Sequence, residues 1–534
     1  MNKIVDSLKI KLKNNREQLK FSLVVTFIFG MICHAYMFFQ DSFSHDSLNE
    51  FNADIYGNEW KIQLGRFAVP LYRMITRGNI TLPWLIGVIS LLWIALSVFI
   101  VIKAFDIKSR VLIVLTAGLF STNIAVIATT ATYIHDLDSN MFALLLSVIA
   151  FYMITRYKYG FLISIPFISL SMGLYQSYVS VTVVLVIIYI IKNLVDGTKF
   201  KEAFIRGVKS IVSIAMGAVL YFISYKSVLL LTGIEEAKDS YNSLDQMGFS
   251  GISELISTIL YIYKTTIYNL LFPKSAISRN IILILIIVSA LIAVIFIFLK
   301  VFDRKIGLLE VALVLFLLMI LPIGLSTADI LKGDTGHDLM RFSDCLLLFL
   351  FLLLTFKSSI SLTKIKKAKG FVKQCGKCIV AVSVAVILFG NVLLANQIYL
   401  KKDLEQDSAL SYFTRIVDRM DSFEDYDRKS TPVVFVGRAD YFDENKVGFS
   451  NGYGIMGSTG NYALGAAGPS WFDRYFEYKL HYDIVTIEND ELDYYKENEI
   501  VISMPSFPDE GCMQIIDGVL VVKLGDVSHT VEEG

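Results

Sequence analysis

Long apolar runs recur along the first 395 residues and constrain the fold more than any other feature of the chain. We find them near residues 21–39, 83–102, 111–129, 141–155, 161–174, 178–191, 211–231, 281–299, 308–325, 345–356 and 378–395. About 20 apolar residues span a bilayer core as a helix, and shorter runs can borrow flanking residues. With 54% hydrophobic and 18% charged residues and a mean hydropathy of +0.58, the chain is predicted to be mainly α and multispanning, with about eleven helices in residues 21–396.

Lysine and arginine in alternate loops predict the orientation in the lipid bilayer. The basic segments are 1–20, 103–110, 156–160, 192–209, 300–305 and 357–377. The loops between them carry most of the acids at the membrane edge: 40–82, 130–140, 172–177, 232–280 and 326–344. The first apolar run lacks a small-residue cleavage pattern, which indicates a retained helix behind a cytoplasmic N-terminus. The alternation then leaves residues 397–534 outside the cytoplasmic membrane.

The segment 397–534 is polar and is predicted to fold as a small extracytoplasmic α/β domain. Its sequence "DLEQDSALSYFTRIVDRMDSF" has the pattern of an amphipathic helix that continues from the last span. Three stretches, "TPVVFVGR", "NEIVISMP" and "GVLVVKLG", are predicted strands. Asp517-Gly518, between "CMQII" and "VLVVKL", is a hairpin signal.

Chemistry is expected where polar residues crowd the outer loops, because ionisable groups at membrane depth are costly. The candidates are His45, Asp46, Trp60 and Arg66 in the first loop, His135, Asp136 and Asp138 in the second, Tyr175 and Gln176 in the third, and Arg341 before the span at 345–356. A carboxylate can accept a hydroxyl proton, for which we favour Asp46 and then Asp138. An arginine fork matches phosphate oxygens. If a divalent metal such as Mg²⁺ or Mn²⁺ is used, Asp136 and Asp138 are its predicted ligands.

Each of these charges also has a simpler interpretation. A single acid in an outer loop can be merely solvated, and an arginine can be held by a neighbouring acid. For Arg66 the nearest such partner in sequence is Glu59, and for Arg341 it is Asp338 or Asp344.

Composition excludes some classes of protein and leaves two alternatives open. The formal net charge is zero, so nucleic-acid binding has no support, and the five scattered cysteines indicate no disulfide framework. A transporter or flippase of lipid-linked sugars would show internal repeats, which we do not find. A glycan-binding assembly subunit could use the tail aromatics, which are more often core residues: Tyr453, Tyr462, Trp471, Phe472 and Tyr475.

The order of these motifs resembles that of the bacterial GtrII-type glucosyltransferase family. The family's first outer loop carries an acidic pair, an aromatic residue and a Gly-Arg, which correspond here to His45-Asp46, Trp60 and Gly65-Arg66. Its Tyr and Asp-Ser before a helix correspond to Tyr133 and Asp138-Ser139, and its Leu-Tyr-Gln to residues 174–176. The tail "MPSFPDEGCMQIIDGVLVVKLG" is similar in style to the family's ending. His45 departs from the acidic pair, which weakens the case for a two-carboxylate metal site in the first loop.

The resemblance implies a GT-C-like membrane enzyme of the bacterial cell envelope. Such an enzyme takes a hexose, here glucose, from a polyprenyl-phosphate carrier on the outer side of the cytoplasmic membrane. It transfers the sugar to a surface polysaccharide, such as an O-antigen or a cell-wall polysaccharide. The resemblance also implies a functional partnership with a lipid-carrier glucosyltransferase and a small flippase.

Overall fold

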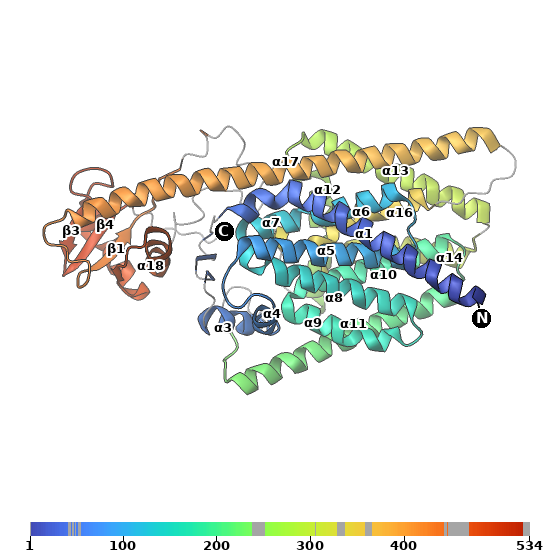
Figure 1. Cartoon of the computed structure of the whole chain (residues 1–534), viewed down its shortest axis with the longest axis horizontal. Helices are drawn as coiled ribbons and strands as arrows, with labels where there is room; N and C mark the ends of the chain where they lie inside the picture. The colour runs from blue at the N-terminus through green and yellow to red at the C-terminus, as the bar shows by residue number, and fades with distance from the viewer. Residues whose placement is uncertain are drawn as a thin grey trace.

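The computed structural model describes residues 2–40, 44, 47–48, 50–51, 55–237, 251–304, 306–327, 337–357, 366–442, 446 and 469–526. Most of these residues form one bundle of helices (Figure 1). One helix, α17 (Lys366–Asp421), runs along the bundle and continues into a small α/β domain at the C-terminal end of the chain. A mainly helical membrane protein with a small C-terminal sheet is therefore confirmed.

The described residues contain nine helices long and apolar enough to cross a membrane and two shorter apolar ones. The long segments are Lys13–Phe39 in α1, Pro83–Ala104 in α5, Arg110–Thr132 in α6 and α7, Ile134–Arg156 in η1 and α8, Gln176–Val195 in η2 and α10, Phe200–Thr232 in α11, Arg279–Phe302 in α13, Leu308–Leu325 in α14 and Lys373–Asp421 in α17. The shorter ones are Gly160–Leu174 in α9 and Phe342–Phe356 in η5 and α16. Each apolar run of the sequence lies in one of these segments.

The predicted basic loops meet at one end of the bundle, which we call the basic end. Arg156 donates to the backbone oxygen of Lys103 at 2.7 Å, and Lys300 donates to Asp196 at 2.8 Å. Lys357, just after α16, bonds the backbone oxygen of Phe105. The C-terminal domain lies beyond the opposite end, the domain end, and the N-terminus of α1 lies at the basic end (Figure 1). The loops therefore alternate between two ends, as the distribution of basic residues predicts.

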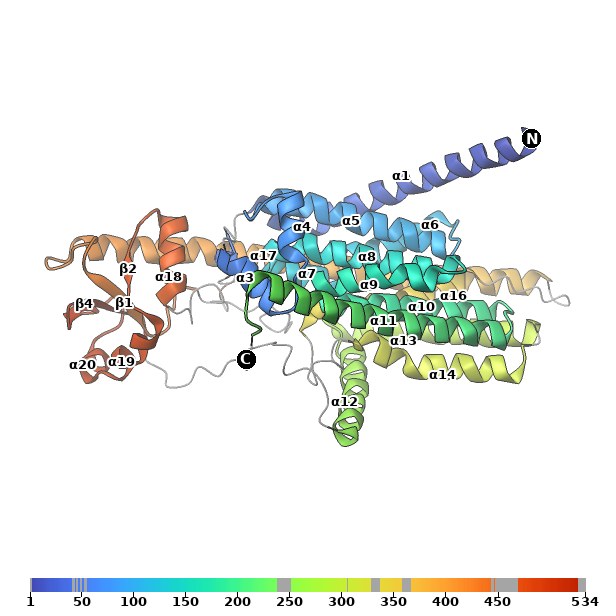
Figure 2. The same ribbon diagram turned by 90° about the horizontal axis from the view of Figure 1, so that it is seen from below.

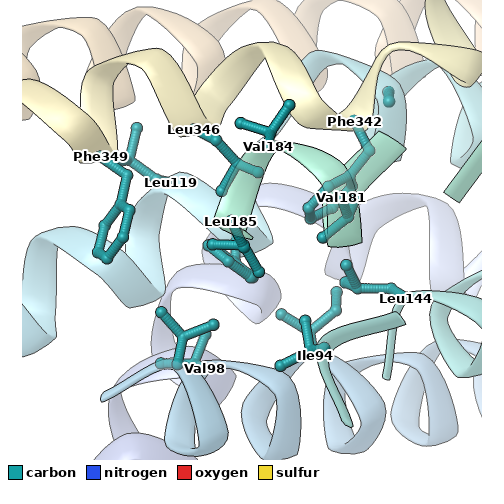
Figure 3. Packing of buried hydrophobic residues seen from close by; sticks show 14 of the residues in the cluster. Ile94, Val98, Leu119, Leu144, Val181, Val184, Leu185, Phe342, Leu346 and Phe349 are labelled. Atoms are coloured by element: carbon teal, nitrogen blue, oxygen red, sulfur yellow. The ribbon is translucent and has the colours of Figure 1, made fainter. Parts of the chain in front are cut away.

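The bundle interior is closely packed and apolar. Figure 3 shows side chains of α5, α6, α8, α10 and α16 meeting there, among them Ile94, Leu144, Leu185 and Phe349, all fully or almost fully buried. The core also contains polar contacts, among them those of His34 on α1. Its two ring nitrogens lie 2.7 Å from the hydroxyl of Tyr399 and 2.8 Å from the backbone oxygen of Ser121, so both are satisfied.

One membrane-spanning segment is broken inside the bundle. Helix α6 (Arg110–Ser121) ends and α7 (Ile124–Thr132) begins after two intervening residues, with Asn123 capping the first turn of α7. Asn391 of α17 donates to the freed backbone oxygen of Thr122 at 2.9 Å, and Asn123 donates to the backbone oxygen of Phe342 at 2.8 Å. Side-chain amides thus satisfy backbone oxygens that find no hydrogen-bond donor in a membrane interior.

Helix α12 (Ile252–Leu271) is oriented differently from the rest. It lies crosswise to the bundle helices at the domain end, as Figure 2 shows. Its buried residues are Thr258, Ile262 and Thr266, while Leu260 and Ile267 on other sides are 66% and 54% exposed. The sequence analysis assigned residues 232–280 to a loop and did not predict this helix.

The C-terminal domain is a four-stranded sheet in the order β2-β1-β4-β3. Strand β1 (Pro432–Val436) pairs in parallel with β2 (Val485–Thr486) and β4 (Val519–Lys523), and β3 (Met513–Ile516) pairs antiparallel with β4. Asp517 and Gly518 both have positive φ, as the predicted hairpin turn requires. The remaining elements are α18 (Pro469–Tyr475), the π-helical turn η8 (Phe476–Leu480), the 3₁₀ turn η9 (Asn489–Glu491), α19 (Leu492–Glu497) and α20 (Glu499–Ser503).

Two expectations for this domain have clear outcomes. The strand predicted in "NEIVISMP" is wrong, because the segment forms α20. The side chain of Asn498 accepts from the backbone N–H of Ile500 and caps the helix, and Val501 and Met504, three residues apart, share one small core. Phe472 and Tyr475 are buried in the main core of the domain, whereas Tyr453 and Tyr462 lie outside the described residues.

The opposite placement of the C-terminal domain and of the start of α1 gives a prediction about orientation. Because basic loops face the cytoplasm, a periplasmic-active phosphatase fused after Gly534 should be active, and the same reporter placed after Gly197 at the basic end should be inactive. Reporter activity normalised to protein level measures this. The reverse pattern would invert the orientation and move the site described below to the cytoplasmic side.

Candidate functional site

Four charged side chains from three segments meet at the domain end and are almost completely buried. Lys61 lies 2.6 Å from a carboxylate oxygen of Asp136 and 3.0 Å from one of Glu50. Arg73 lies 2.9 Å from the other oxygen of Asp136 and 2.8 Å from Glu50. Burial alone would raise the pKa of Glu50, but attraction by the neighbouring cations outweighs burial and lowers it. Both acids are therefore shared between the same two cations.

A second pair lies beside this group. Arg77 donates from Nε to Asp138 at 2.9 Å and also donates to the backbone oxygen of His135. The side chains of Arg77 and Asp138 are 1% and 0% exposed. We call the seven charged residues of this region the charge cluster: Glu50, Lys61, Arg66, Arg73, Arg77, Asp136 and Asp138. It holds four cations and three carboxylates among the described residues, so positive charge is in excess.

Arg66 is the cation of the charge cluster with the loosest carboxylate contact. Its nearest carboxylate oxygen, on Asp136, is 3.7 Å away, and its Nε is buried without a hydrogen-bond partner in the described part of the chain. The guanidinium carbon lies 4.5 Å from the ring centroid of Tyr175. The expected salt-bridge partner Glu59 is not the one found. Arg66 thus keeps hydrogen-bonding capacity for a further anion.

The local backbone explains why Arg66 follows a glycine. Helix α3 (Ile55–Gln63) ends two residues before Gly65, whose φ of 77° lies in the left-handed region that glycine adopts without strain. The chain then turns, and α4 (Val69–Thr76) carries Arg73 back toward the bundle. This short helix-turn-helix places Lys61 before the turn, Arg66 in the turn and Arg73 after it.

Side chains of the bundle fix this turn through its backbone oxygens. Gln176 donates to the backbone oxygen of Leu64 at 2.8 Å and to the hydroxyl of Tyr221 at 3.1 Å. Tyr221 and Tyr225, both on α11, donate to the backbone oxygens of Gly65 and Gln63 at 3.1 and 3.0 Å. Gln176 is therefore a positioning residue in this structure. Tyr175 and Gln176 of the Leu-Tyr-Gln motif both contact the Gly-Arg turn.

The predicted base Asp46 and its neighbour His45 lie outside the described residues. The residues flanking them are placed against α7 and the 3₁₀ turn η1 (Ile134–Asp136). Ser44 donates to the backbone oxygen of Thr132 at 2.6 Å, and the Ser47 hydroxyl lies 3.2 Å from Nδ1 of His135. The first loop is thus attached to the charge cluster on either side of positions 45 and 46. Trp60 is 39% exposed on α3, next to Lys61.

Arg341 lies apart from the charge cluster. It follows the 3₁₀ turn η4 (Asp338–Met340) and precedes η5 (Phe342–Asp344), and its Nε lies 3.1 Å from Asp344, one of its two expected partners. Three aromatic rings form a row in space that leads from Arg66 to Phe342, the residue after Arg341. Tyr175 contacts Arg66, Tyr178 lies 5.9 Å from Tyr175, and Phe342 lies 5.7 Å from Tyr178, measured between ring centroids.

The two aspartates predicted to bind a metal are poorly suited to one. Asp136 faces Lys61 and Arg73, and Asp138 faces Arg77, so a divalent cation would have to displace these partners and enter a region of positive charge. Within the described residues there is no group of three or more His, Cys, Asp or Glu side chains that could hold a metal. The geometry favours anion binding over cation binding.

Comparison with known proteins gives one match. The family model described as glucosyl transferase GtrII matches residues 35–333, which is more than half of the chain. The chain belongs to the GtrII glucosyltransferase family. Neither a curated protein nor a solved structure matches it.

Membership in the GtrII family makes this membrane protein a glucosyltransferase. The match includes every residue of the charge cluster and every predicted site residue except Arg341. It ends before α16, so the similarity noted in the C-terminal segment lies outside it. The sequence analysis did not select Lys61 and Arg77 as candidates. Both lie in the same loop as Arg66, which contains all four cations of the charge cluster, and this concentration was the available signal.

Because two cations share Asp136, we expect removal of its carboxylate to lower the stability of the protein strongly. In Asp136→Asn, Lys61 and Arg73 lose a buried anion, and unfolding free energy should fall by about 3–5 kcal/mol. Thermal unfolding of the purified protein in detergent measures this.

Asp106→Asn is the matched control, because Asp106 is 63% exposed and pairs with Arg156 at the basic end. That substitution should cost no more than about 1 kcal/mol. Equal melting temperatures for the Asp136 and Asp106 variants would show that the buried pairing contributes little.

Proposed function

We propose that this glucosyltransferase takes glucose from a polyprenyl-phosphate carrier and transfers it to a cell-surface polysaccharide on the outer side of the cytoplasmic membrane. The observation that carries this proposal is the charge cluster, which is buried, holds four cations and three carboxylates among the described residues, and lies at the end of a membrane-spanning bundle. A donor anchored in the bilayer presents its phosphate at this level. A soluble nucleotide-sugar would not need a site enclosed by apolar helices.

In the proposed reaction an acceptor hydroxyl attacks the anomeric carbon of glucose. A new carbon–oxygen bond forms there as the bond from that carbon to the phosphate oxygen breaks, and the electron pair leaves with polyprenyl phosphate. The hydroxyl proton passes to the general base, for which Asp46 remains our candidate because it is the acid in the loop segment between Ser44 and Ser47. Asp138 is less suited to this role, since Arg77 holds it in a fully buried ion pair.

Arg66 is proposed to bind the donor phosphate. Its guanidinium stacks on Tyr175, its carboxylate contact is loose, and a planar fork can donate two hydrogen bonds to two phosphate oxygens. As the phosphate leaves, the negative charge on it grows, and a fixed cation stabilises that charge without reorganising. The exposed ring of Trp60 is the proposed contact for the sugar.

The role of Asp46 is tested by removing its proton acceptor while keeping its shape. Asp46→Asn should lower turnover by about 10²–10⁴-fold with the melting temperature unchanged. The assay is transfer from a short-chain prenyl-phosphoglucose to a polysaccharide acceptor by purified protein. Turnover close to wild type would move the base to another acid.

The role of Arg66 is tested by comparing lysine with alanine at that position. A lysine keeps the charge but has no fork, so Arg66→Lys should lose turnover almost as completely as Arg66→Ala if the phosphate is bound bidentately. Turnover and melting temperature are measured for both variants. Full recovery with lysine, together with a lower melting temperature for alanine, would make Arg66 a structural residue.

A further inference from the structure

A second site lies under the crosswise helix α12. There the end of α12, the loop to α13 (Arg279–Arg304) and the start of α16 (Cys345–Phe356) enclose a cavity of about 180 Å³ together with α6, α7 and α17. None of the described residues of the charge cluster lines it. Tyr178 and Phe342 lie between the two regions.

The cavity is polar on one side and apolar on the other, and the helix directions show which side is which. Its charged residues, Lys274, Asp338, Arg341 and Asp344, all precede or adjoin helix starts at the domain end. Six of its apolar residues lie about one turn further toward the basic end: Leu119, Ile282, Ile286, Leu347, Leu348 and Ile387. Others, such as Leu270, Phe272 and Pro273, lie beside Lys274 in the chain. An anionic head group with a long apolar chain fits this arrangement, whereas a free sugar would leave the apolar surface uncovered.

The polar side lies below the membrane surface. Helix α16 has 12 residues and a length of about 18 Å, which is less than the roughly 30 Å of a bilayer core. The irregular segment with Arg341 before it is therefore at membrane depth, where such backbone occurs only if it is buried in protein or lines a cavity. Helix α12 contributes Thr266, Asn269 and Leu270 to the lining and lies crosswise to the bundle (Figure 2), with Leu260 and Ile267 exposed, as expected of a helix in the plane of the membrane surface.

Two cations face the polar side from different segments. Lys274 donates to both oxygens of Asp338, at 2.8 and 2.7 Å, and its side chain is 30% exposed. Arg341 uses Nε for Asp344, and in the amide orientation that satisfies both groups its terminal nitrogens donate to Asn269 at 2.6 and 3.0 Å. A guanidinium has five donors, so a phosphate can replace the neutral Asn269 while Asp344 keeps its bond.

The cavity is too far from the first loop to hold the reacting phosphate. Helix α7 separates the two regions, since Asn123 at its start bonds Phe342 beside the cavity and Thr132 at its end accepts from Ser44. Nine helical residues span about 13 Å, more than the width of one hexose. We infer that the cavity under α12 is a second binding site, for the phosphate and first isoprene units of a prenyl phosphate lipid, with Lys274 and Arg341 on the phosphate.

This inference rests on the proposed function in its choice of an isoprenoid chain. Two lipids carry a phosphate on a prenyl chain. The glucose-bearing donor is a phosphodiester with one negative charge, and the spent carrier is a phosphomonoester with up to two negative charges. Both are tested as soluble C15 probes, farnesyl phosphoglucose and farnesyl monophosphate. Binding is measured by calorimetry on the full-length protein in detergent, without any acceptor, so the result does not depend on turnover.

All binding is measured in an Arg66→Ala background, so that the site proposed for the reacting phosphate does not contribute. We expect at least one probe to bind this protein, and the added Lys274→Met/Arg341→Met changes to weaken binding about 100-fold, because two charge-assisted hydrogen-bonding groups are lost. Lys264→Met is the matched control, since Lys264 is exposed on α12 and does not line the cavity. Asp46→Asn added to this background should leave binding unchanged. The probe that loses more affinity in the double variant identifies the carrier form. Inorganic phosphate at the same concentration should not compete, because it lacks the chain.

A photoreactive farnesyl phosphate on wild-type protein gives a readout independent of variant folding. Labelled peptides from residues 266–286 or 341–348 support the site. Unchanged affinity of the double variant, no binding of either probe, or labelling confined to other segments would overturn it. If glucose transfer is absent but these peptides are labelled, the proposed function fails and the lipid site stands.

Discussion

The carboxylate of Asp136 joins the first loop to the bundle, and the geometry of the domain end depends on it. The aspartate lies at the head of α8 (Leu137–Arg156), inside a membrane-spanning segment, yet its partners Lys61 and Arg73 come from the helices on either side of the Gly65 turn. Taking three such charges out of water is costly unless each is paired, and here Oδ1 of Asp136 faces Arg73 while Oδ2 faces Lys61. The pairing therefore fixes where α3 and α4 sit.

The pairing of Asp136 with Lys61 and Arg73 positions Arg66, but Arg66 itself is not one of the close partners of Asp136. The turn that carries it is held at its backbone by Gln176, Tyr221 and Tyr225, and its guanidinium rests on Tyr175. The C-terminal domain completes the enclosure of the loop, because Leu48 is buried in the core of that domain and the ring of Phe51 lies 4.8 Å from that of Tyr478. One loop is thus fastened both to the bundle and to the domain.

The sequence predicts the spans well because the length and apolarity of a helix in a bilayer are local properties. It also groups the loops correctly into two ends, since basic residues follow the same alternation. It does not predict that Lys61 pairs with Asp136, 75 residues away, or that Arg77 pairs with Asp138, because such partners depend on how helices pack. The sequence does not predict helix α12, because Thr, Tyr and Asn interrupt its apolar pattern. It predicts a strand instead of α20, because the segment is rich in β-branched residues, whereas capping by Asn498 favours the helix.

Helix α17 places a mechanical limit on the C-terminal domain. It has 56 residues and no break, so it measures about 84 Å and joins the membrane-spanning bundle to the sheet as one rod. Near its exit from the bundle Tyr399 bonds His34, and 14 and 17 residues later Phe413 and Ile416 are buried in the core of the domain. Each residue of an α-helix adds about 1.5 Å and 100° of rotation. The number of residues between these two anchor points therefore sets both the height of the domain above the bundle and the direction it faces, so that the domain meets the first loop at one fixed distance and angle.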